Sequence, residues 1–321
     1  MNIDQSTTLK IGSAREPNQS NSDGKACFDG IYTRDDPREY YRVLYGLDYI
    51  IPDLAKAIFR NTVRALEQAR GRPVKVLDLG CSYGNNGILL RMPLDFHRLA
   101  QRYSDLSHFD LSPAKLMDLD RDYLKGWPTS DVRVIGLDSA SEAIAYAKGI
   151  GAIDDGLAVN LETDDLTAEH KAMLKDVDLI VSTGCIGYVG PTTFAKLLDA
   201  IETPPWVASF VLRMYPFDSI DDVLRHRGLI TEKLQGVTFV QRRFHSMDEC
   251  RSVLSALAQA GVLTEDKEDE GLLHAEFLLS RGPGDIKGVP LEQIANVTTG
   301  ADHTFGRRYR RDSDNVVRLT R

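Results

Sequence analysis

Short apolar runs alternate with amphipathic stretches from about residue 53 to residue 281. Residues 53–68 place apolar side chains every three or four positions, which predicts a helix. Seven apolar runs follow, each bounded by polar or glycine-rich segments, and each predicts a strand: 74–78, 132–138, 156–160, 177–184, 206–214, 237–244 and 272–279. Because helical patterns separate most of these strands, the chain is expected to form an α/β fold with a mostly parallel seven-stranded sheet.

The first strand ends in an acidic residue and continues directly into a glycine-rich turn. Gly80 and Gly84 have no Cβ atom, so a ligand can approach the backbone there, and the following helix start would aim N–H groups at it. The spacing is Asp-x-Gly-x-x-x-Gly, which differs from the Gly-x-Gly-x-x-Gly of dinucleotide sites. The candidate cofactor-binding residues of this turn are Asp78, Gly80, Cys81, Ser82, Tyr83 and Gly84.

The second strand also ends in an acidic residue, Asp138. A carboxylate at this position can accept hydrogen bonds from two ribose hydroxyls. The next residues, Ser139 to Glu142, have the spacing of a capping box, so a helix is expected to start at once. Asp138 and Ser139 are therefore further candidates for cofactor binding.

This succession of glycine turn, helix, strand, aspartate and helix resembles class I S-adenosylmethionine-dependent methyltransferases. The resemblance implies a Rossmann-like fold whose last strand is antiparallel, with S-adenosylmethionine as the cofactor. It also implies adenine contacts at Asn160 and Leu161, after the third strand, and a sulfur-side border at Thr183 and Gly184, after the fourth. The competing interpretation is another doubly wound α/β domain in which two strands end in acidic residues by chance.

Three segments, residues 47–52, 78–84 and 210–216, are together similar to a bacterial subgroup that includes azetidine-2-carboxylate synthases. Two reactions therefore stay open. One is methyl transfer to a small molecule, as in bacterial secondary metabolism. The other is cyclisation of S-adenosylmethionine itself to azetidine-2-carboxylate, with release of methylthioadenosine. A cofactor-binding subunit without catalytic activity is a third possibility.

Tyrosines are concentrated before the core, where Tyr41, Tyr45 and Tyr49 repeat every four residues. This spacing predicts one helical stripe, and aromatic faces attract a sulfonium cation, so residues 32–52 are expected to form a lid over the site. Ordinary packing of the stripe on the core is the alternative. The candidate catalytic residues are Tyr45 and Tyr49 in the lid, and Ser182, Tyr188 and Tyr215 near strand ends.

The pattern divides the chain into three parts. Residues 1–52 are a polar N-terminus followed by the helical lid, residues 53–281 are the cofactor-binding core, and residues 282–321 are a tail. Residues 91–128 look like a helical insertion, in which Ser112 and Pro113 begin a helix. From His303 onward the tail carries six arginines and two aspartates. It is expected to be either mobile or an arm that docks on the body or on a partner subunit.

Composition limits the classes of partner. A net charge of −8 argues against nucleic acid as the main partner, and no apolar run reaches membrane-spanning length. The four cysteines form no Cys-x-x-Cys pair, which argues against a zinc site or a disulfide framework. We therefore expect a cytoplasmic enzyme without a metal that acts on a small molecule, with a homodimer as a possible assembly.

Overall fold

A computed structural model describes residues 29–104, 110–295, 308–311 and 316–320. The polar N-terminal residues 1–28 and most of the arginine-rich end lie outside the described part. The strands of the described part are β1 (Lys75–Leu79), β2 (Arg133–Asp138), β3 (Asp155–Ala158), β4 (Leu179–Thr183), β5 (Trp206–Leu212), β6 (Ile230–Lys233), β7 (Thr238–Arg243), β8 (Leu272–Arg281), β9 (Arg308–Arg311) and β10 (Val316–Thr320).

These strands form one sheet in the order β3-β2-β1-β4-β5-β8-β7-β10-β9, with β6 paired to β8. Strands β1 to β5 are parallel to one another, whereas β8 is antiparallel to β5, β6 and β7. This order, with an antiparallel last core strand, is that of the Rossmann-like class I methyltransferase fold, as the sequence predicted. The seven expected strands are all present, and β6, β9 and β10 extend the sheet beyond them.

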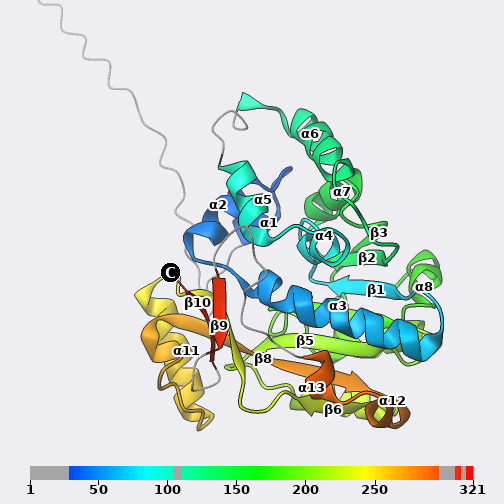
Figure 1. Cartoon of the computed structure of the whole chain (residues 1–321), viewed down its shortest axis with the longest axis vertical. Helices are drawn as coiled ribbons and strands as arrows, with labels where there is room; N and C mark the ends of the chain where they lie inside the picture. Colours follow the sequence, from blue (N-terminus) through cyan, green and yellow to red (C-terminus); the bar gives the residue numbers. More distant parts are fainter. Residues whose placement is uncertain (1–28, 105–109, 296–307, 312–315, 321) are drawn as a thin grey trace, which may run out of the picture.

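Helices cover both faces of the sheet (Figure 1). One buried cluster joins α3, α4, α7 and α11 to the sheet, and a second joins α8, α9 and α10 to the opposite face. Val76 belongs to the first cluster and the next residue, Leu77, to the second, because successive strand side chains point to opposite faces. The helices of these layers are α3 (Ile51–Arg70), α4 (Asn85–Arg91), α7 (Ser141–Gly149), α8 (Ala168–Leu174), α9 (Pro191–Ala200), α10 (Asp218–His226) and α11 (Met247–Gln259).

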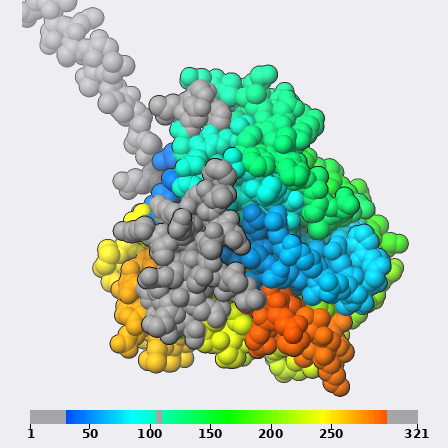
Figure 2. Space-filling model, viewed as in Figure 1, coloured from blue at the N-terminus to red at the C-terminus, as the bar shows by residue number. Residues whose placement is uncertain are grey.

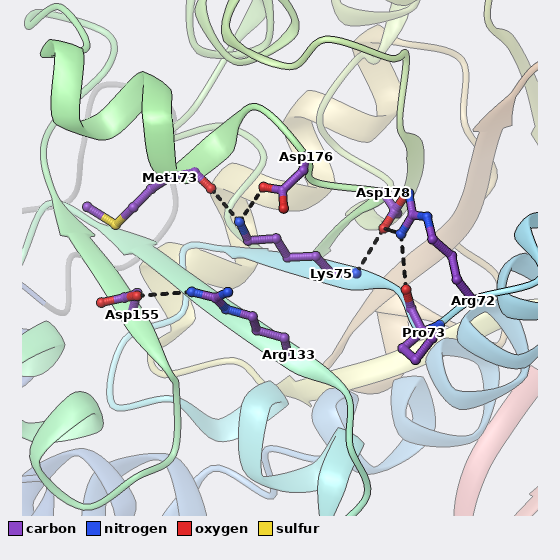
Figure 3. Close-up of polar contacts among 8 residues, drawn as sticks. All are labelled: Arg72, Pro73, Lys75, Arg133, Asp155, Met173, Asp176 and Asp178. Atoms are coloured by element: carbon purple, nitrogen blue, oxygen red, sulfur yellow. Dashed lines mark hydrogen bonds and ion pairs between the residues drawn. The ribbon is translucent and has the colours of Figure 1, made fainter.

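A polar network fixes the starts of the parallel strands (Figure 3). Asp178 accepts hydrogen bonds from the Lys75 backbone N–H at 3.0 Å and from the Arg72 guanidinium at 2.7 and 2.9 Å. The Lys75 ammonium group in turn donates to the Met173 carbonyl at 2.8 Å and pairs with Asp176. These bonds hold the start of β1 against the start of β4. They leave the opposite end of the sheet, where the glycine turn follows β1, open for a ligand.

Two of the predicted helix caps are confirmed, and one is wrong, although its helix is present. Ser112 caps α6 (Pro113–Lys125) and Ser246 caps α11, each by accepting the N–H of the residue three positions on. The capping box expected at Ser139 is not formed, because α7 begins at Ser141 with Ala140 as its N-cap and no side-chain cap. The carboxylate of Asp138 accepts the Ala140 N–H at 3.0 Å instead.

The predicted lid is two short helices, α1 (Asp29–Tyr32) and α2 (Arg38–Gly46), and a connection to α3. The prediction of one stripe through Tyr49 is wrong, because α2 ends at Gly46 and Asp48 adopts a positive φ of 55°. Tyr49 therefore lies in the connection between α2 and α3. A non-glycine residue in the left-handed region marks a sharp turn, which the periodicity of the tyrosines does not reveal.

The predicted insertion holds α5 (Phe96–Tyr103) and α6, and α5 packs on the lid. The rings of Tyr41 and Tyr103 stack with their centroids 4.5 Å apart, and Tyr49 packs edge-on against Phe96 at 5.1 Å. Beneath them, Asp120 accepts hydrogen bonds from the hydroxyls of Tyr103 and Tyr146, each at 2.6 Å. These contacts join α2, α5, α6 and α7 into one wall above the carboxyl ends of the strands.

Part of the predicted tail is ordered against the core. A short 3-10 helix, η2 (Glu268–Glu270), precedes β8, and α12 (Pro283–Gly288) and α13 (Leu291–Ile294) follow it. α13 lies against α3 (Figure 2), where the Asn61 amide donates to the Ile294 carbonyl at 3.1 Å. Farther on, β10 pairs in parallel with β7, and β9 pairs antiparallel with β10. Among the described residues, no helix is both long and apolar enough to span a membrane.

Candidate functional site

A cavity of about 390 Å³ lies at the carboxyl ends of β1, β2, β3 and β4, beneath the lid. This volume is in the range of small-molecule sites. Most of the residues predicted for the cofactor line it: Gly80, Cys81, Ser82, Asp138, Ser139, Asn160, Leu161, Thr183 and Gly184. Two of the predicted catalytic residues, Tyr49 and Tyr188, also line it, and Tyr188 is 41% exposed.

The glycine turn is held by backbone hydrogen bonds and by Asp138. Gly80 has a φ of 71°, and its N–H donates to the Leu137 carbonyl at 2.8 Å. Ser82 also has a positive φ, 48°, and its N–H donates to Asp138 Oδ2 at 2.8 Å. The Asp138 carboxylate thus stabilises a backbone conformation that is unfavourable for a serine. The turn lies against β2 as a result.

Packing within the protein gives a further reason for glycine at positions 80 and 84. A Cβ atom at Gly80 would lie 2.6 Å from the Cβ of Cys185, in the loop after β4. At Gly84 it would lie 2.7 Å from Ala152, outside the cavity lining. Both glycines therefore allow close packing of loops, and Gly80 also lines the cavity.

Asp138 has the properties expected of a ribose acceptor. Its two oxygens each accept one backbone N–H, from Ser82 and Ala140, and a carboxylate oxygen has room for a second donor. Burial raises the pKa of Asp138, while these backbone N–H groups act in the opposite direction. The side chain is fixed in place and lines the cavity, so its remaining acceptor capacity fits a ligand with adjacent hydroxyls.

Asp78, the other acidic residue predicted to bind the cofactor, lies behind the cavity wall. It is fully buried, and its Oδ1 accepts from the Asn86 amide at 2.9 Å. Its Oδ2 is buried with no hydrogen-bond partner, and burial raises the pKa of Asp78 to about 7. The same Asn86 amide nitrogen donates to Thr183 Oγ1 at 3.1 Å. Asp78 therefore reaches the cavity through Asn86 and Thr183.

Four other predicted residues lie outside the lining. The Tyr83 hydroxyl donates to the carbonyls of Ile31 and Arg34 at 3.1 and 2.9 Å, so it anchors the lid. The Ser182 hydroxyl is buried and donates to Ser209 at 2.9 Å between β4 and β5. The Tyr45 ring packs on His97 with centroids 5.2 Å apart. The Tyr215 ring occupies the space beside Gly187.

The sequence did not single out several lining residues on the lid side. Asn85 donates to the Tyr40 hydroxyl at 2.7 Å and accepts from the Tyr41 hydroxyl, so it bonds α4 to α2. Asn85 and Asn86 stand in the first turn of α4, where polar residues usually face water, but here they are buried. In the sequence, the two adjacent asparagines directly after the glycine turn could have indicated these lining residues.

Two more lining residues, Gln241 and Arg242, come from β7, and no sequence pattern indicated them. Arg242 forms a buried ion pair with Glu249, with nitrogen–oxygen distances of 2.6 and 2.9 Å. Arg242 therefore adds little net charge to the cavity. In the described part of the chain, no group of three or more His, Cys, Asp or Glu side chains is arranged to hold a metal ion.

No protein-family model matches the chain, and no curated protein matches it. Solved structures do, at low identity. A TehB-like SAM-dependent methyltransferase from Corynebacterium glutamicum ATCC 13032 Kitasato is 16% identical, with 68% of this chain and 86% of that chain covered and a TM-score of 0.34. The plantazolicin methyltransferase BpumL in complex with SAH is 15% identical, with 79% and 90% covered and a TM-score of 0.36. These TM-scores are low, so the fold assignment depends on the strand order of this chain.

Proposed function

We propose that this protein binds S-adenosylmethionine and transfers its methyl group to a small molecule. The observation that carries the proposal is the cavity at the carboxyl ends of β1 and β2, where Asp138 both holds the Gly80–Ser82 turn and faces the ligand space. Open α/β sheets bind their ligands at this end. The strand order supports the same assignment.

The lining residues suggest how the cofactor would be held. Asp138 would accept the ribose hydroxyls, while Asn160 and Leu161, after β3, would border the adenine. The turn from Gly80 to Ser82 would lie along the amino-acid half. When bound, S-adenosylmethionine supplies a methyl group activated by a sulfonium sulfur and leaves as S-adenosylhomocysteine.

The lid would exclude water from the cavity and provide aromatic contacts to the sulfur, both of which favour methyl transfer. Tyr40, Leu44 and Tyr49 line the cavity from above, and Tyr40 and Leu44 are buried. All three side chains would exclude water, and the two tyrosines would present aromatic faces to the positively charged sulfur, a contact worth about 2 kcal/mol when desolvated. Burial raises the pKa of the Tyr49 hydroxyl and so favours its neutral form. A neutral Tyr49 would position the acceptor, not deprotonate it.

A product analysis tests the proposal. The purified chain is incubated with S-adenosylmethionine, with and without a panel of small hydroxyl and amine compounds, and the products are separated by mass spectrometry. We expect S-adenosylhomocysteine and a methylated compound only when an acceptor is present. Methylthioadenosine together with azetidine-2-carboxylate, formed from S-adenosylmethionine alone, would instead support the cyclisation. Failure to bind S-adenosylhomocysteine in calorimetry would contradict use of this cofactor altogether.

A further inference from the structure

The pairing of β7 with β8 contains an irregularity at one residue. Val240 pairs with His274 and Arg242 pairs with Leu273, so Gln241 has no partner residue on β8. This is a β-bulge, which places one extra residue in a strand and changes the direction of its side chain. The Gln241 carbonyl accepts the N–H of Ile50 at 2.9 Å, just before α3, so the bulge is also tied to the lid connection.

The bulge directs the Gln241 side chain into the cavity. Gln241 lines the cavity although only 3% of the residue is exposed. A Cβ atom at Gly184 would lie 2.2 Å from Gln241 Nε2, so the glycine after β4 leaves the space that this amide occupies. Gln241 Oε1 is buried and has no hydrogen-bond partner in the protein. A buried amide oxygen without a partner is costly, and a ligand that donates a hydrogen bond to Gln241 Oε1 would remove this cost.

Gln241 stands at the end of the cavity away from the proposed adenine and ribose positions. Asn160 and Asp138 follow β3 and β2 at one edge of the parallel strands, whereas β7 lies beyond β4, β5 and β8. If the cofactor extends from β3 across β2 to the turn after β1, its sulfur points toward Gly184 and Gln241. The acceptor would then occupy the end lined by Gln241.

We propose that Gln241 Oε1 accepts a hydrogen bond from an N–H or O–H group of the methyl acceptor and thereby selects it. This inference rests on the proposed methyltransferase function. The neighbouring lining groups are the neutral Tyr49, Thr183 and Asn86, together with Arg242, whose charge is balanced by Glu249. The substrate class that fits is therefore an uncharged, partly apolar molecule with at least one hydrogen-bond donor. The acceptor's lone pair would form the bond to the methyl carbon as the carbon–sulfur bond breaks toward sulfur, and the methylated product would release the proton to solvent on leaving the cavity.

A pair of probes of equal shape tests this recognition directly. Indole has an N–H donor, and benzofuran has an oxygen in its place. Both are titrated by ligand-observed NMR into the full chain loaded with S-adenosylhomocysteine. We expect indole to bind about tenfold more tightly than benzofuran, as one hydrogen bond to an otherwise unpaired group predicts. In Gln241→Met, which keeps the length without the amide, the ratio should fall to about one.

The matched control is Gln259→Met, at an exposed position on α11. This variant should keep the wild-type ratio. Equal binding of the two probes by the wild-type protein, binding of neither, or an unchanged ratio in Gln241→Met would overturn the proposal. Calorimetry with S-adenosylhomocysteine separates two further outcomes. A tenfold loss of its affinity in Gln241→Met would show that Gln241 holds the cofactor and not the acceptor, whereas absence of binding to the wild-type protein would contradict the proposed function itself.

Discussion

Asp78 and Asp138 end adjacent strands, but their surroundings give the two carboxylates different properties. Asp138 accepts two backbone N–H groups and faces the cavity, so it is a fixed acceptor with capacity left for a ligand. Asp78 has one amide partner, one buried oxygen without a partner, and a pKa raised to about 7. From the sequence, both residues were expected to contact the cofactor, whereas in the structure only Asp138 lines the cavity.

Replacing Asp138 should weaken cofactor binding. In Asp138→Ala the ribose loses its acceptor and the Ser82 and Ala140 N–H groups lose theirs, so affinity for S-adenosylhomocysteine should fall by about 1.5–3 kcal/mol, roughly 10- to 100-fold. Calorimetry measures the loss. The control is Asp131→Ala, which removes the same charge at an exposed position. Unchanged affinity in a folded Asp138→Ala protein would rule out the ribose assignment.

The buried carboxyl of Asp78 should make the ligand-free protein less stable at neutral pH than at acidic pH. In the unfolded chain its pKa is about 3.9, and in the folded chain burial raises it to about 7. The folded state therefore binds the proton more tightly, and the penalty for ionising Asp78 grows as pH rises from about 4 and is complete above about 7. Asp78→Asn does not titrate. Its free energy of unfolding, measured by urea denaturation, should exceed that of the wild-type protein by more at pH 8 than at pH 5.

Asp131→Asn is the control for this comparison, since an exposed carboxylate should give a difference that does not change between the two pH values. A constant difference for Asp78→Asn as well would show that Asp78 is ionised in the folded protein throughout this range. Bound S-adenosylmethionine carries positive charge near this carboxylate in the proposed mode. Cofactor binding should therefore reduce the contrast between pH 5 and pH 8.

Sequence patterns located the cavity better than they assigned its individual residues. Asp138, Gly80, Thr183 and Asn160 follow from a simple rule, because parallel strands present their carboxyl ends at one edge of the sheet. The roles of Ser182 and Tyr83 depend on which side of the backbone each side chain takes and on what packs above it. Gln241 depends on one extra residue in a strand, a feature for which alternation of apolar and polar residues gives no signal.

At the scale of elements, most predicted helices and strands are present within a few residues of their expected bounds. The tyrosine stripe failed because periodicity does not indicate where a helix ends. The turn at Asp48 is fixed by contacts from distant β7, where the Arg243 guanidinium pairs with Asp48 at 2.8 Å and its backbone N–H donates to the Leu47 carbonyl at 2.8 Å. The lid connection is therefore bound to the strand that carries the bulge.

Asn85 is expected to hold the lid closed. It is the hydrogen-bond partner of two buried tyrosine hydroxyls on α2, so Asn85→Leu leaves Tyr40 and Tyr41 without this partner and should destabilise α2 by about 1–3 kcal/mol. Hydrogen exchange of α2 backbone amides should become roughly 5- to 100-fold faster, while exchange in β1 and β4 stays slow. Glu39→Gln, in the same helix, breaks only an ion pair with the exposed Arg42, which is worth about 0.2–0.5 kcal/mol, so exchange should change by less than about threefold. Equal acceleration throughout the chain would indicate global destabilisation and contradict a local role for Asn85.

At the scale of the whole molecule, β8 holds two regions of the sheet together. Its first half pairs with β7 and its second half with β6, while β5 lies along its other side. The parallel half of the sheet carries the proposed cofactor positions, and the antiparallel half carries Gln241. The proposed cofactor and acceptor ends of one cavity thus come from sheet regions that meet at β8, and the lid connection bridges them above.

The C-terminal strands should protect the far edge of this sheet. β10 pairs in parallel with β7 at Val316–Thr238 and Val317–Phe239, and β9 covers β10 in turn. A chain ending at Ala295 keeps α13 on α3 and all seven core strands, so it should still bind S-adenosylhomocysteine. The unpaired backbone groups of β7 would then form an exposed edge, which favours association between copies.

Sedimentation velocity of the two chains checks this expectation, and it also tests the homodimer that the sequence left open. The shortened chain should show more self-association, rising with protein concentration, than the full chain. Calorimetry should give S-adenosylhomocysteine affinities within about threefold of each other, because one unchanged binding site predicts a difference below about 0.7 kcal/mol. A shortened chain that sediments like the full one would show that β9 and β10 do not prevent association through the edge of β7. Loss of cofactor binding would instead show that the support they give to β7 extends through the bulge at Gln241 to the cavity.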